Sequence, residues 1–93
     1  MNRREAAETL ALRALAWVAS DEDRLHPFLA TSGLGADELG PRAGDPDLLA
    51  AVLDFVLAED ARVLALAAEL GQPPEAVLRA RAALPGGDLP HWT

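Results

Sequence analysis

The sequence of 93 residues contains no cysteine, no tyrosine, no isoleucine and no lysine. Without cysteine, the chain forms no disulfide bonds and offers no thiolate ligands to a metal ion. The β-branched and aromatic residues that favour strands are scarce, whereas leucine and alanine, the strongest helix formers, are abundant. The composition therefore predicts an all-α fold, which we expect to be a compact orthogonal bundle of about five short helices.

Long apolar runs are also missing. The most apolar stretch, residues 48–58, includes Asp54 and is too short to span a bilayer. Arg3 and Arg4 are followed by Glu5 and Glu8 rather than by the apolar segment of a signal peptide. We expect a cytoplasmic protein that does not associate with membranes.

The chain is acidic, with a net charge of −7, and residues 21–60 carry most of this charge. An acidic protein repels nucleic acids and anionic membranes at long range. Many of the carboxylates stand at predicted helix starts, where they cap free N–H groups and favour the positive end of the helix dipole. Helix capping therefore explains where these carboxylates stand without a binding role. The residues concerned are Asp21, Glu22, Asp23, Asp37, Glu38, Asp45, Asp47, Glu59, Asp60 and Glu75.

Apolar spacing and breaking residues locate the helices. Asp45-Pro46 places a capping side chain before a proline at the first helical position, and Gly33 and Gly71 suit the left-handed position that ends a helix. Proline is tolerated in the first turn of a helix, so the second helix should begin near Asp23 or at Pro27. The predicted helices cover residues 3–19, 23 or 27 to 33, 46–58, 59–70 and 73–84, with one short turn at 36–39. We expect residues 1–87 to form a single domain and residues 88–93 a C-terminal tail.

The helix predicted over residues 46–58 is apolar nearly all round, a pattern typical of a helix that others surround. Its water-facing side should be a narrow stripe of Asp47, Ala51, Asp54 and Ala58. Trp17 falls on the apolar stripe of the first helix, which predicts a position in the core.

Residues 61–84 resemble a helix-turn-helix, with an alanine-rich helix, a glycine in the turn and a second helix that carries Arg79 and Arg81. In a nucleic-acid-binding module these two arginines would contact the phosphates. The pattern is degenerate, and two arginines beside Glu75 in an acidic chain are few for such a role. Nucleic-acid binding is therefore the alternative function, and the charge balance disfavours it.

The sequence shows no pattern of catalytic chemistry. His26 and His91 lie far apart, and neither has a second histidine at the spacing of a metal site. No nucleophile stands in a recognisable catalytic motif, and no glycine-rich phosphate loop is present. We predict that the protein is not an enzyme and needs no cofactor.

The last residues of the chain hold the clearest candidate contact for a partner. Trp92, with Leu89 nearby, either docks on the bundle or forms an exposed aromatic anchor for another protein. The leading hypothesis is therefore a non-enzymatic interaction domain that binds an unknown protein partner or a second copy of itself.

Several runs, spread over nearly the whole chain, resemble a family of small bacterial proteins of unknown function and about this length. The resemblance implies a single all-helical domain and supplies no catalytic residue. The runs that carry it are Ala16-Trp17-Val18-Ala19 leading to Phe28-Leu29, Ser32-Gly33-Leu34, Arg42-Ala43-Gly44-Asp45-Pro46, Val52-Leu53-Asp54-Phe55-Val56, and Gln72-Pro73-Pro74-Glu75 through Leu84-Pro85-Gly86-Gly87.

Overall fold

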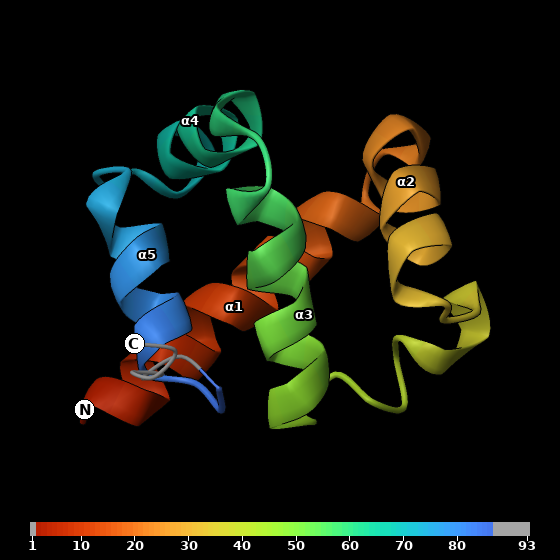
Figure 1. Ribbon diagram of the computed structural model, residues 1–93, viewed down its shortest axis with the longest axis horizontal. Helices are drawn as coiled ribbons and strands as arrows, with labels where there is room; N and C mark the ends of the chain where they lie inside the picture. The colour runs from red at the N-terminus through yellow and green to blue at the C-terminus, as the bar shows by residue number, and fades with distance from the viewer. Residues whose placement is uncertain (1, 87–93) are drawn as a thin grey trace, which may run out of the picture.

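Five α-helices and one short 3₁₀ turn make up the part of the chain that the computed structural model describes, residues 2–86 (Figure 1). No strand occurs within this range, so the predicted all-α fold is confirmed. Leu89, His91 and Trp92 lie outside the described residues. The elements are α1 (Arg3–Ala19), α2 (Glu22–Ser32), η1 (Ala36–Glu38), α3 (Pro46–Leu57), α4 (Asp60–Leu70) and α5 (Glu75–Ala82).

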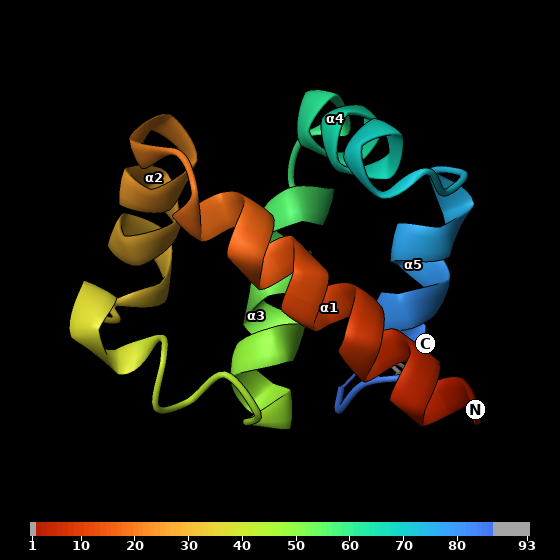
Figure 2. The same cartoon turned by 180° about the vertical axis from the view of Figure 1, so that it is seen from behind.

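Helix α3 is the centre of the bundle, as its sequence predicts. It packs against all four other helices and crosses α1 obliquely (Figures 1 and 2). Leu53 and Val52 are completely buried, and the ring of Phe55 meets that of Phe28 from α2 edge to face, with centroids 5.5 Å apart. Such an aromatic pair adds stability beyond the burial of its area, so it ties α2 to the core. The predicted water-facing stripe is confirmed at three of its four positions: Ala51 is half-buried, and the exposed ones are Asp47, Asp54 and Ala58.

Local capping explains where the helices begin and end. Asn2 forms a capping box with Glu5 at the start of α1, and Asp45 accepts a hydrogen bond from the Asp47 N–H at the start of α3. Gly33 and Gly71 end α2 and α4 with φ angles of 75° and 65°, a conformation that residues with a Cβ rarely adopt. These groups satisfy backbone N–H and C=O atoms that the helices themselves leave unpaired. Among residues 2–86, no helix has both the length and the apolar character that crossing a bilayer requires.

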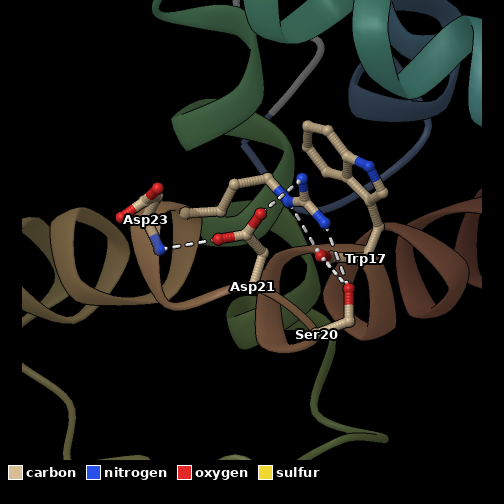
Figure 3. Close-up of polar contacts among 5 residues, drawn as sticks. Trp17, Ser20, Asp21 and Asp23 are labelled. Atoms are coloured by element: carbon tan, nitrogen blue, oxygen red, sulfur yellow. Dashed lines mark hydrogen bonds and ion pairs between the residues drawn. The ribbon is translucent and has the colours of Figure 1, made fainter.

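A network of polar contacts fixes the corner between α1 and α2 (Figure 3). The guanidinium of Arg24 lies 4.1 Å from the ring centroid of Trp17, and its Nε donates to the Trp17 carbonyl oxygen at 2.9 Å. The same guanidinium donates to Ser20 Oγ at 3.1 Å and forms an ion pair with Asp21 at 3.4 Å. Trp17 is half-buried at the edge of the core, with Arg24 over its ring, so the predicted core position is confirmed only in part.

The structure decides between the two predicted starts of the second helix: a start near Asp23 is confirmed, and a start at Pro27 is wrong. Helix α2 begins at Glu22, and Pro27 stands six residues into it, in the second turn rather than at its start. The start lies upstream because Asp21 caps the helix, accepting a hydrogen bond from the Asp23 N–H at 2.8 Å. Pro27 has no N–H, so it cannot donate to the Asp23 carbonyl one turn earlier.

We expect Arg24→Ala to lower the free energy of unfolding by about 1–2 kcal/mol. The substitution removes a cation–π contact of about 0.5–1 kcal/mol and hydrogen bonds of about 1 kcal/mol net from a side chain that is 28% exposed. Urea unfolding followed by circular dichroism measures the difference. Arg4→Ala is the control, because its exposed ion pair with Glu8 should contribute only about 0.3–0.5 kcal/mol. Equal effects of the two variants would contradict the structural role of the corner.

Candidate functional site

The eight arginines of the chain fall into two groups. Five of them form salt bridges: Arg4 with Glu8, Arg24 with Asp21, Arg42 with Glu38 and Asp45, Arg62 with Glu59, and Arg81 with Asp54. Within residues 2–86, the other three form none; they are Arg3, Arg13 and Arg79.

Arg3, Arg13 and Arg79, which form no salt bridge within the described part of the chain, line one groove, which we call the α1–α5 groove. Helices α1 and α5 pack side by side (Figures 1 and 2). The groove lies between them and has a volume of about 470 Å³. None of its lining residues, all from the described part of the chain, is acidic. They are Arg3, Ala6, Ala7, Thr9, Leu10 and Arg13 from α1, Gln72 from the connection before α5, and Ala76, Arg79 and Ala80 from α5.

Helical spacing brings these residues together. Arg3, Ala6, Leu10 and Arg13 follow one another at intervals of three or four residues, so they share one side of α1. Arg3 and Arg13 are ten residues apart, which corresponds to about 15 Å along the helix axis. The groove is therefore a stretch of helix surface with a cationic side chain near each end and small or apolar side chains between them. Arg79 adds a third positive charge from the opposite wall.

The structure separates the two arginines that the helix-turn-helix pattern pairs. Residues two apart on a helix point in nearly opposite directions, so Arg79 faces the α1–α5 groove and Arg81 faces α3. Arg81 donates to both carboxylate oxygens of Asp54, at 2.6 Å and 3.3 Å, and to the Pro85 carbonyl oxygen at 2.9 Å. Its side chain is 17% exposed. The Asp54 carboxylate thus occupies the donors that a phosphate would need.

A second groove lies between α2 and α3 and has a similar volume of about 470 Å³. Pro27, Phe28, Ala51 and Phe55 are among the residues that line it. Its charged residues are already paired, since Asp54 binds Arg81, and Glu59 binds Arg62, which also lies 3.9 Å from the Phe55 ring centroid. The groove therefore offers apolar surface without an unpaired charge to select a partner.

The other candidate residues occupy structural positions. His26 is exposed, and no group of three His, Asp or Glu side chains within residues 2–86 is placed to hold a metal ion. The prediction that acidic residues mark helix starts is confirmed for Asp21, Asp45 and Glu75, among others. The Arg42 guanidinium, which donates to Asp45 at 2.9 Å, holds the pKa of that carboxyl below its usual range.

We expect Asp45→Asn to destabilise the protein slightly at neutral pH and to have less effect in acid. Asparagine keeps the capping hydrogen bond but loses the ion pair with Arg42. Because the folded-state pKa of Asp45 is lowered, its ionic contribution is present above about pH 4, the ordinary value, and disappears as the pH falls through the lowered one. Urea unfolding at neutral and acidic pH measures the difference in the free energy of unfolding between the variant and the wild type. In an Arg42→Gln background this difference should shrink at neutral pH. A difference that is the same at every pH would contradict an ionic contribution from Asp45.

Sequence comparison places the chain in a family. Residues 4–87 match the family model described as a protein of unknown function (DUF3572). The chain belongs to this family. The match confirms the resemblance to a family of unknown function, and its range contains every residue that lines the α1–α5 groove except Arg3. No curated protein and no solved structure matches the chain.

Proposed function

We propose that this DUF3572 chain is a small, non-enzymatic protein-interaction domain that binds its partner through the α1–α5 groove. The observation that carries the proposal is the convergence of Arg3, Arg13 and Arg79 on that groove. The bacterial origin and the cytoplasmic location that the sequence indicates belong to the same proposal.

The pairing of the arginines supports a binding role. In a chain with a net charge of −7, an exposed arginine has carboxylates available, and within residues 2–86 five of the eight arginines use them. The other three surround an apolar floor of Ala6, Ala7, Leu10, Ala76 and Ala80. Arginine is enriched at the energetically important positions of protein interfaces, and an apolar floor rimmed by charge is the usual anatomy of such a site.

The partner contact predicted for Trp92 and Leu89 remains a prediction, because these residues lie outside the described part of the chain. The helix-turn-helix alternative is less well supported than the interaction hypothesis. In that alternative the Arg81 guanidinium would be free to bind a phosphate, whereas here it is bound to both carboxylate oxygens of Asp54.

Site-specific photocrosslinking in the cells of origin tests the proposal. A photoreactive amino acid replaces Thr9 or Gln72, two exposed residues of the groove, or Ala61, an exposed residue of α4 outside it. We expect one and the same protein adduct from both groove positions and none from position 61. The adduct should disappear when Arg13 and Arg79 are both changed to glutamine. Identical adducts from position 61, adducts that nuclease treatment removes, or no adduct from the groove would overturn the proposal.

A further inference from the structure

The chemistry of the α1–α5 groove specifies the kind of partner it fits. We infer that its occupant is an acidic segment of another protein in which carboxylates alternate with apolar side chains. The inference rests on the function proposed above and adds the chemical class of the partner.

The charges of the groove call for several carboxylates on the partner. Arg3 and Arg13 stand about 15 Å apart along α1, and Arg79 faces them from α5. A guanidinium binds a carboxylate through two parallel hydrogen bonds, which are stronger than bonds between neutral groups. A partner segment that reaches all three arginines must therefore cover about 15 Å, which is about ten residues of helix.

The floor of the groove calls for apolar side chains between those carboxylates. Leu10 is only partly buried, and the alanines around it leave room for a partner side chain to approach the helix surface. Burial of apolar area supplies affinity that exposed ion pairs alone do not. The occupant should hence carry leucine-like residues as well as carboxylates.

Charge and symmetry argue against two other occupants. Three arginines would neutralise only about three phosphates, and the remaining charge of the protein would repel the rest of a nucleic acid. If two copies bound each other through this groove about a two-fold axis, the groove arginines of one copy would face the same arginines of the other and repel them. A second copy bound through its acidic surface would form a head-to-tail contact, which leads to rings or open filaments rather than to a dimer.

Fluorescence anisotropy with defined peptides tests the inference. The probe is a labelled peptide of glutamate and leucine about twelve residues long, enough to cover the groove as a helix. One comparison peptide has glutamine in place of glutamate, and another has serine in place of leucine. We expect saturable binding of the glutamate–leucine peptide at low ionic strength. Each comparison peptide should bind about tenfold more weakly or worse, which corresponds to a loss of about 1.4 kcal/mol of binding free energy.

Two matched variants show whether the groove is the binding site. Arg13→Gln/Arg79→Gln removes two charges from the groove, and Arg4→Gln/Arg42→Gln removes two charges from salt bridges outside it. Both variants leave the same net charge, so bulk electrostatics are equal. The groove variant should bind the glutamate–leucine peptide about tenfold more weakly than the control variant, with both variants folded by circular dichroism.

The possible outcomes are distinct. Equal binding by the two variants, or equal binding of the glutamate and glutamine peptides, would overturn the inference. Duplex DNA that binds more tightly than the peptide, and that loses affinity in the groove variant, would assign the surface to nucleic acid. If every peptide fails while the arginine-dependent photocrosslink persists, the partner chemistry is wrong and the interaction function stands. If both fail, both proposals fall.

Discussion

Leu53→Ala should lower the free energy of unfolding by about 2–5 kcal/mol, because it truncates a fully buried side chain at the centre of the core. Leu53 is 0% exposed and lies in α3, which packs against every other helix. Removing its side chain loses buried apolar contacts and leaves a cavity that the surrounding helices can only partly fill. A domain of this size has a total stability of about 5–14 kcal/mol, so this one substitution removes a large share of it.

Urea unfolding followed by circular dichroism, with thermal unfolding beside it, measures the effect of Leu53→Ala. The matched control is Leu64→Ala, the same chemical change at a side chain of α4 that is 59% exposed. This control should change stability by less than about 0.5 kcal/mol, as is usual for surface substitutions. Similar losses from the two substitutions would mean that α3 is not the centre of the core.

The helix boundaries could be predicted because the groups that set them are close in the sequence. Asp45-Pro46 begins α3 and Gly71 ends α4, as the capping pattern predicts. The all-round apolar sequence of α3 likewise predicted its central place. In each case the deciding pattern lies within one short segment of the chain, so it can be recognised without knowing which helices pack together.

The features that the sequence does not predict depend on contacts between residues of different helices. Arg24 reaches back to Trp17 across the α1–α2 corner and covers the indole at the edge of the core. Arg81 has no acidic residue three or four positions away, yet it binds Asp54, which lies 27 residues earlier in the chain. Arg79 has Glu75 at helical spacing and forms no salt bridge within the described residues. Spacing along the helix would therefore predict a salt bridge for Arg79 and none for Arg81, and the described part of the chain shows the reverse.

The α1–α5 groove was only partly visible in the sequence. The sequence gives one usable signal for it, because Arg3 and Arg13 have no acidic residue at three or four positions in either direction and recur on one side of the first helix. Nothing in the sequence places α5 beside that side of α1. The sequence draws attention to the third arginine of the groove, Arg79, for a different reason, as part of a predicted recognition helix. Tertiary packing of α5 on α1 is what assembles the candidate site.

Pro27→Ala should stabilise the protein by about 1–3 kcal/mol, the reverse of the usual effect of a substitution. Pro27 lies six residues into α2, where proline is less favourable than alanine by about 3 kcal/mol because it lacks an N–H and crowds the preceding turn. Alanine restores a hydrogen bond donor to the Asp23 carbonyl. The gain is reduced because alanine also gives the unfolded chain more conformational freedom, an effect of about 0.4–1 kcal/mol.

Pro46→Ala is the control for this prediction. It is the same chemical change, but we expect it to change the free energy of unfolding in the opposite direction. Pro46 is the first residue of α3, where the N–H of any residue would lack an acceptor within the helix. Only the effect on the unfolded chain remains there, so Pro46→Ala should destabilise the protein by about 0.4–1 kcal/mol. Urea unfolding of both variants should therefore move the midpoints in opposite directions. If Pro27→Ala also destabilises the protein, the proline ring contributes more through the α2–α3 groove that it lines than its missing N–H costs the helix.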